Sequence, residues 1–131
     1  MPWLVDTNVL SELVRPRPNA GVAQWAAGAS RISVSVITLE EILFGLAWKP
    51  NAKIRRWFEL FFEEACDLLP VTDEIAERAG MMRGDLRAEG ETRSQADMLI
   101  AATAQVHGLT LVTRNVRDFE GCRIALMNPF V

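Results

Sequence analysis

Long apolar runs are missing from this sequence. The longest uninterrupted apolar stretch is Met98–Ala102, far short of the roughly 20 residues that a membrane-spanning helix needs. The N-terminal segment Met1–Asp6 has no basic residue and ends in an acid, which is unlike a secretion signal. We therefore expect a cytoplasmic protein with no membrane segment.

Cysteine and histidine are scarce. Cys66 and Cys122 stand outside any Cys-x-x-Cys pattern, and His107 is the one histidine. This scarcity disfavours a disulfide framework, and it disfavours zinc, which is usually bound by several Cys and His ligands. We interpret both cysteines as buried thiols and His107 as an ordinary residue near the end of a helix.

Lysine is rare too, because 12 of the 14 basic residues are arginine. The net charge of −3 argues against a general nucleic-acid binder. Arginine is nevertheless the residue whose planar guanidinium pairs best with phosphate. The 131 residues are half hydrophobic and contain no linker, repeat or low-complexity tract. We expect one domain spanning residues 1–131.

What the sequence does contain is an alternation of short β-branched runs with helical patterns. The runs predict strands, and apolar residues spaced three and four apart predict helices. The expected strands are 3–5, 32–36, 68–71, 109–113 and 124–127, and the expected helices are 9–14, one starting at Asn19, 38–49, 52–65, 73–89 and 94–107. This order predicts an α/β fold with a mostly parallel sheet and helices on both faces.

Three acids stand where strands end or helices begin. Asp6 directly follows the first strand, and Asp is also a good helix N-cap. Glu41 forms a Thr-x-x-Glu pattern with Thr38, which is typical of a capping box. Asp97 follows Ser94 in a similar pattern at the start of an apolar helix, where the helix dipole favours an acid. Each acid thus has a structural explanation as well as a functional one.

Two further oxygen donors, Asn115 and Asp118, follow the fourth strand. Either is compatible with ordinary turn chemistry. In a parallel sheet, however, all five of these side chains should meet at one edge. Carboxylates about 4 Å apart would repel one another by about 4 kcal/mol per pair at an effective dielectric constant near 20. A hard divalent cation such as Mg²⁺ or Mn²⁺ would reverse that penalty.

Four segments in this order resemble the motifs of PIN-domain ribonucleases, and within that family the VapC toxins of bacterial toxin–antitoxin pairs, in particular the FitB-like branch. The segments are Val5–Val9, Thr38–Gly45, Asp97–Ala104 and Leu111–Asn115, and the closing Met127–Phe130 also resembles that branch. The resemblance runs from Leu4 to Phe130, although residues 50–93 match only in helical pattern.

The resemblance implies a PIN-like fold and an endoribonuclease that hydrolyses RNA with a bound Mg²⁺ or Mn²⁺. Asp6, Glu41 and Asp97 match the family's acidic catalytic and metal-binding positions. Asn115 matches a fourth catalytic position that is Asp in some relatives, and Asp118 is a candidate for the missing carboxylate at the metal. Candidates for RNA phosphate contacts are arginines near these motifs, namely Arg93, Arg114 and Arg117, with Arg15 and Arg17 also considered.

The resemblance also implies a homodimer inhibited by a cognate antitoxin, which rather than this chain would contact DNA. The candidate surface for a partner is the helix expected at 52–65, because Leu60 and the pair Phe61–Phe62 exceed what one apolar stripe requires. The alternative is that a sandwiched helix buries both of its sides.

Two other functions are disfavoured because a required residue is missing. A phosphatase of the haloacid dehalogenase type needs an Asp where Asn8 stands, and a receiver domain needs a lysine late in the chain, where none follows Lys53. Two alternatives within the fold are a housekeeping RNA-processing nuclease and a non-catalytic interaction module, for which Asn115 would mark a degraded site.

Overall fold

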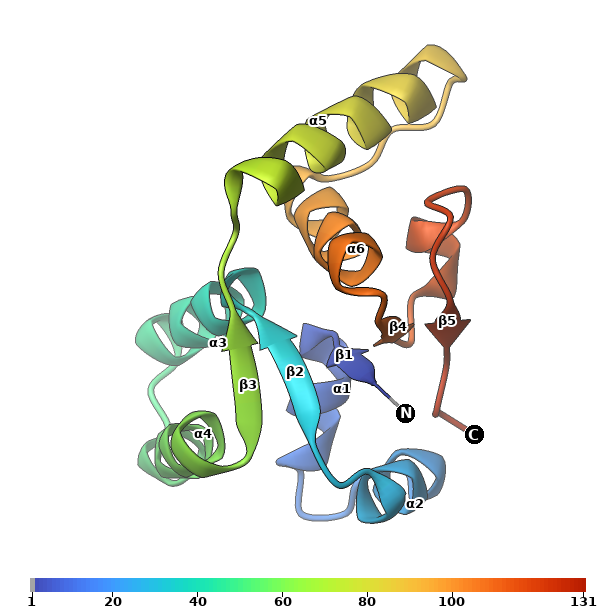
Figure 1. Cartoon of the computed structure of the whole chain (residues 1–131). Helices are drawn as coiled ribbons and strands as arrows, with labels where there is room; N and C mark the ends of the chain where they lie inside the picture. The colour runs from blue at the N-terminus through green and yellow to red at the C-terminus, as the bar shows by residue number, and fades with distance from the viewer. Residues whose placement is uncertain (1) are drawn as a thin grey trace.

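A single parallel sheet organises the chain. The computed structural model describes residues 2–131, and its strands are β1 (Trp3–Val5), β2 (Ile32–Ser35), β3 (Cys66–Leu69), β4 (Thr110–Val112) and β5 (Leu126–Met127). The spatial order is β3-β2-β1-β4-β5, with every neighbouring pair parallel (Figure 1). β1 therefore lies in the middle, where its polar neighbours are surrounded by protein.

Helices cover both faces of this sheet (Figure 1). They are α1 (Thr7–Leu13), α2 (Ala20–Gly28), α3 (Val36–Trp48), α4 (Ala52–Glu64), α5 (Asp73–Ala88), α6 (Gln95–His107) and the 3₁₀ turn η1 (Val116–Phe119). Leu4 packs in a core with residues of α5, α6 and η1, whereas the adjacent Val5 packs in a second core with residues of α1, α2, α3 and α4. The two-residue period of a strand thus splits β1 between two cores.

The α/β, mostly parallel fold is confirmed, although the boundaries of several elements differ from the expected ones. α3 begins at Val36 rather than at Thr38, because the hydroxyl of Ser35 accepts a hydrogen bond from Ile37 N at 3.0 Å and caps the helix. β3 occupies Cys66–Leu69 rather than residues 68–71. Pro70 has no N–H to offer the ladder, so the strand ends before it.

The aromatic helix α4 buries more of its surface than one stripe. Phe58 is buried, and Ile54, Phe61 and Phe62 are half-buried against the same core. Phe61 and Phe62 thus take part in packing, as in the alternative of a helix that buries both of its sides, whereas Leu60 remains exposed. The exposed apolar side chains lie beside them, at Trp57 and Leu60 on α4 and at Leu43, Phe44 and Trp48 on α3. No helix in residues 2–131 is long and apolar enough to cross a membrane.

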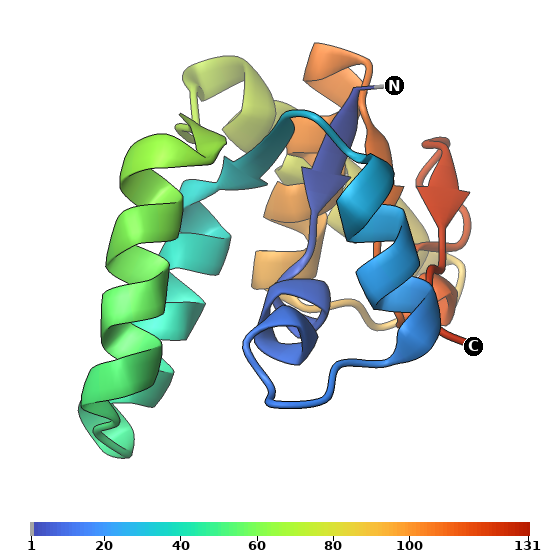
Figure 2. The ribbon, with the colours of Figure 1, turned by 90° about the horizontal axis from the view of Figure 1, so that it is seen from below.

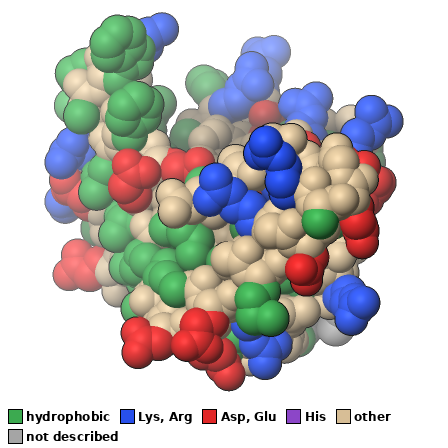
Figure 3. Space-filling model, turned by 90° about the horizontal axis from the view of Figure 1, so that it is seen from above, with side chains coloured by type: hydrophobic (Ala, Val, Ile, Leu, Met, Phe, Trp, Pro, Cys, Tyr) green, Lys and Arg blue, Asp and Glu red, His purple; other side chains and the backbone are tan. Residues whose placement is uncertain are grey.

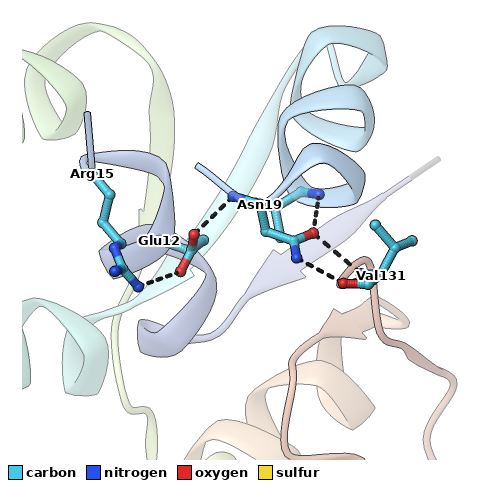
Figure 4. A network of polar contacts seen from close by, with 5 residues as sticks. Glu12, Arg15, Asn19 and Val131 are labelled. Atoms are coloured by element: carbon cyan, nitrogen blue, oxygen red, sulfur yellow. Dashed lines mark hydrogen bonds and ion pairs between the residues drawn. The ribbon is translucent and has the colours of Figure 1, made fainter. Parts of the chain in front are cut away.

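The last residues of the chain are fastened to the start of α2 (Figure 4). Asn19 caps α2, and its amide also donates to Val131 O at 2.9 Å and accepts from Val131 N at 3.2 Å. Glu12 at the end of α1 accepts from Asn19 N at 2.8 Å. The chain can pass this close only because Gly21 has no side chain: a Cβ there would overlap the Pro129 carbonyl oxygen.

Gly21→Ala should therefore lower the free energy of unfolding by roughly 1–3 kcal/mol, the usual cost of overpacking. Gly28→Ala in the same helix is the matched control, since a Cβ there meets nothing within 4 Å and alanine favours helix by up to about 1 kcal/mol. Urea denaturation of both variants checks this. Equal stability of the two would show that the terminal segment does not pack against α2.

Candidate active site

Asp6 is positioned by the middle strand. β1 ends at Val5, and the N–H of Asp6 still pairs with Val112 O of β4 at 3.0 Å. The Asp6 side chain then caps α1, because Oδ1 accepts from Thr7 N at 2.8 Å. Only 5% of Asp6 is exposed. Asp6 is thus a helix N-cap, as the sequence suggested, and it is also a buried carboxylate at the C-terminal edge of the sheet.

The other oxygen of Asp6 is held by two residues that the sequence reasoning did not assign to the site. Oδ2 accepts from the Thr113 hydroxyl at 2.8 Å and from Asn8 Nδ2 at 3.2 Å. Burial raises the pKa of Asp6, and the hydrogen bonds from Thr113, Thr7 and Asn8 oppose that rise. Both positions lie within the quoted motifs, but only the folded chain shows that they converge on one oxygen.

Glu41 lies inside α3 rather than in its first turn. The Thr7 hydroxyl donates to Glu41 Oε1 at 2.7 Å and lies 3.2 Å from the hydroxyl of Thr38. Since Ser35 is the N-cap, the capping-box explanation for Thr38 and Glu41 is wrong. Glu41 is instead half-buried, and its carboxylate is held by Thr7, the residue that follows Asp6 in the chain.

Asp97 occupies the first turn of α6, where its N–H donates to the capping Ser94 hydroxyl at 3.0 Å. Burial raises the pKa of Asp97, and the negative charges of Asp6, Asp118 and Glu41 raise it further, against the hydrogen bond with Ser94. α1 and α6 both begin at the edge to which β1 points (Figure 2). Asp97 therefore shares that edge with three other carboxylates.

The segment after β4 supplies the remaining predicted residues. Asn115 is exposed and directly precedes η1, and its N–H donates to the Thr113 hydroxyl at 3.1 Å. Its side chain makes no capping hydrogen bond to the turn. Asp118 lies within η1, with an exposed carboxylate whose charge acts on Asp6 and Asp97. Asp118, rather than Asn115, thus adds a negative charge to the group.

These four carboxylates, Asp6, Glu41, Asp97 and Asp118, have no basic partner in residues 2–131: none of them takes part in an ion pair. They do not form a closed cage either. In that same part of the chain, no three His, Cys, Asp or Glu side chains lie close enough together to hold a metal ion. The carboxylates at this edge are thus not neutralised by basic side chains, and they stay apart from one another because like charges repel.

The predicted arginines lie around this edge. Arg93 donates from Nη1 to the Asp118 carbonyl oxygen at 2.7 Å. Arg114 is exposed and lies 4.8 Å above the ring of Phe130, in cation–π geometry. Arg117 is exposed within η1. None of the three forms an ion pair within residues 2–131, so each guanidinium retains donors for another group.

A cavity of about 520 Å³ is lined by residues of α1, α3 and α4, with Glu41 among them. Thr7 and Glu41 contribute polar atoms to it, and much of its wall is apolar, including Leu46 and Phe58. The site therefore continues into a groove that reaches the aromatic helix.

Comparison with known proteins agrees with this arrangement. The model of the PIN domain family matches residues 3–121. The chain belongs to the PIN domain family. It is 33% identical to toxin FitB of Neisseria gonorrhoeae, with 97% of each chain covered, and 32% identical to the VapC ribonuclease Y4jK of Sinorhizobium fredii, covering 97% of this chain and 96% of that one. The crystal structure of FitAcB from N. gonorrhoeae superposes with a TM-score of 0.84, at 32% identity and 97% coverage of both chains. The family resemblance, including its FitB-like and VapC character, is thereby confirmed.

The chemistry of this PIN domain's site suits a divalent metal better than a thiol nucleophile. Both cysteines are buried and free, as predicted. Burial raises the pKa of Cys66 to about 11, which keeps its thiol protonated at neutral pH. The carboxylates at the edge of the sheet offer hard oxygen donors, and their unbalanced charge fits a cation such as Mg²⁺ or Mn²⁺.

The raised pKa values of Asp6 and Asp97 predict how stability depends on pH when no metal is bound. The ordinary pKa of both carboxyl groups is 3.8. As pH rises from this value toward the raised pKa values of the folded state, the unfolded chain loses these protons first, so folding stability falls. Asp97→Asn should flatten this fall and raise the melting temperature at neutral pH by roughly 2–5 °C. Melting curves in EDTA from pH 4 to 8 test this, with exposed Asp85→Asn as the control. Stability rising for wild type across this window, or an identical shift in the control, would contradict the assignment.

Proposed function

We propose that this PIN domain is a metal-dependent endoribonuclease acting as the toxin of a toxin–antitoxin pair. The main observation behind this proposal is the group of four carboxylates at the C-terminal edge of the sheet. Burial and the charges of the other three raise the pKa of the fourth, Asp97, and none of the four forms an ion pair within residues 2–131. Uncompensated buried charge lowers stability unless a ligand balances it. A catalytic cation is the ligand that accounts for keeping such a group.

Asp6, Glu41 and Asp97, with Asp118, would hold Mg²⁺ or Mn²⁺. Such an ion usually binds through one or two carboxylates and keeps several of its waters, so it would not require the closed cage that residues 2–131 lack. When bound, such an ion supplies charge neutralisation at the phosphodiester and a lowered pKa for a coordinated water. Asn115 offers a neutral amide oxygen, so its contribution is to positioning at the rim, and Asp118 supplies the fourth negative charge.

The chain's own residues prepare these groups for the reaction. Thr113 and Asn8 hold Oδ2 of Asp6, and Thr7 N holds Oδ1, so the Asp6 carboxylate cannot rotate freely. Thr7 fixes Oε1 of Glu41. That leaves Oε2 of Glu41 to accept the proton of the attacking water as general base.

RNA phosphates would be contacted by arginines that surround the carboxylates, namely Arg93, Arg114 and Arg117. Their free guanidinium donors suit phosphate oxygens. Single-stranded or looped RNA is the expected substrate, since its backbone can bend into an edge site and its bases are accessible. Support comes from the names of the relatives, one of which is a VapC ribonuclease and another a toxin.

The groove beside Glu41 and the exposed residues of α4 suit a small antitoxin. Its apolar segment would cover Trp57 and Leu60, which are 37% and 41% exposed, and an antitoxin arginine would reach the carboxylates through the cavity. We propose that the chain forms a homodimer and that DNA is contacted by the antitoxin, which agrees with this chain's net charge of −3.

The purified chain should cleave RNA with Mg²⁺ or Mn²⁺ and stop when EDTA is added. Asp6→Asn or Asp97→Asn should lower the rate by at least about 100-fold, because each removes a charge that positions the cation. Asp85→Asn, at an exposed position on α5, should keep the wild-type rate. Full cleavage in EDTA or in Asp97→Asn would refute the metal mechanism.

An intact fold that binds RNA but never cleaves it, with Mn²⁺ present, would favour the non-catalytic module instead. Cleavage without any inhibitory partner encoded nearby would favour a housekeeping RNA-processing nuclease. RNA-end sequencing after brief expression identifies the cleaved RNA in either case.

The partner proposal predicts a dimer in solution and inhibition by the product of an adjacent small gene. Trp57→Glu with Leu60→Glu should weaken that inhibition by roughly 100-fold, because charges replace apolar contacts. Met81→Glu is the control, at an exposed apolar residue of α5. Light scattering that shows a monomer at micromolar concentration would refute the dimer, and inhibition unchanged in the double variant would refute the α4 surface.

A further inference from the structure

One face of α5 carries a basic pocket that the site described above does not include. Gly80, Arg83, Gly84 and Arg87 are spaced i, i+3, i+4 and i+7, so they lie on the same side of the helix. With Thr92 and Arg93 from the following loop they line a cavity of about 320 Å³. The two glycines provide its floor, because a Cβ at either position would meet nothing within 4 Å.

The charge of this pocket is uncompensated. Within residues 2–131, Arg83, Arg87 and Arg93 form no ion pair, and no acid lines the pocket. Asp85 on α5 and Glu89 at its C-cap line a different cavity. Seen from above, one group of Lys and Arg side chains lies near the middle of the surface, and others lie with acids around its rim (Figure 3).

The basic pocket connects to the carboxylate edge through Arg93. Its guanidinium lines the pocket and donates to the carbonyl oxygen of Asp118 at 2.7 Å. Asp118 in turn acts electrostatically on Asp97 and Asp6. Arg93 also lies in the loop that leads from α5 to the start of α6 (Figure 2). An RNA strand held at the carboxylates by a cation would therefore pass Arg93 on its way to α5.

We propose that Arg83, Arg87 and Arg93 form a second phosphate-binding subsite, which holds the RNA backbone some nucleotides away from the bond that is cut. The inference rests on the proposed nuclease function and extends its substrate contact. Three guanidiniums around a glycine floor present many N–H donors in a space that admits phosphate oxygens, and they contact backbone rather than bases. The subsite thus contributes affinity and direction of the strand without sequence specificity.

The test is binding of a fluorescein-labelled, single-stranded RNA of 20 random nucleotides to the full chain in EDTA, where cleavage is blocked. Arg83→Gln with Arg87→Gln should weaken binding roughly tenfold at low salt and reduce the slope of log affinity against log salt by about 1.4, which corresponds to two lost phosphate contacts. In cleavage assays with metal, the loss should fall mainly on KM.

The matched control is Arg55→Gln with Arg56→Gln, which removes the same charge from exposed positions on α4. Gly84→Glu and Gly84→Gln form a second pair of equal size, in which the carboxylate should weaken RNA binding more than the amide. This pair needs no arginine removal, and the open floor at Gly84 leaves the fold unstrained.

Equal losses in the α4 control, or a salt slope unchanged in the Arg83/Arg87 variant, would overturn the proposal. If the Arg83/Arg87 variant lost antitoxin binding but kept RNA binding, the proposal would also be overturned, because the pocket would then bind an acidic protein segment. Equal, arginine-dependent affinity for duplex DNA of the same length would overturn the assignment to RNA. Binding is measured without metal, so the two proposals can fail separately. RNA binding that depends on the pocket, with no cleavage, would refute only the proposed nuclease function. Cleavage with an unchanged KM in the Arg83/Arg87 variant would refute only the proposed subsite.

Discussion

The constraint on which this structure depends is the burial of a carboxylate at the end of the central strand. Asp6 is almost fully covered by protein, and desolvation raises its pKa. Three hydrogen bonds, from Thr7, Asn8 and Thr113, keep it in place. These hydrogen bonds connect the start of α1 with the residue that follows β4, so the Asp6 side chain fixes the relative position of the two elements at the sheet edge.

Around Asp6 the fold adds charge instead of removing it. Glu41, Asp97 and Asp118 come from α3, α6 and η1, and no basic side chain in residues 2–131 pairs with them. The arginines nearby bind backbone or an aromatic ring, as Arg93 and Arg114 do. Such an arrangement costs stability in the free protein, and we propose that a cation and a polyanion bind at this edge and compensate for that cost.

The sequence predicts the topology and the position of the acids because both follow from simple periodicities. Alternating strand and helix patterns imply a parallel sheet, and residues just beyond its strands must meet at one edge. Asp6 follows from that argument, whereas Asp97 lies in the first turn of α6 and was assigned from its helix-start pattern and the family resemblance. The start of α3 was not assigned correctly, since Ser35 and Thr38 are both acceptable caps and only strand pairing of β2 up to Ser35 decides between them. Thr113 was not assigned either, because its hydrogen bond with Asp6 joins residues more than 100 positions apart.

The most direct test of the account is calorimetric titration of Mn²⁺ into the metal-free chain at neutral pH. We expect saturable binding to the wild-type chain, weakened at least about tenfold by Asp97→Asn and unchanged by Asp85→Asn. The absence of Mn²⁺ binding to folded wild-type protein, or equal affinity in wild type and Asp97→Asn, would contradict the claim that these carboxylates are kept together for a cation.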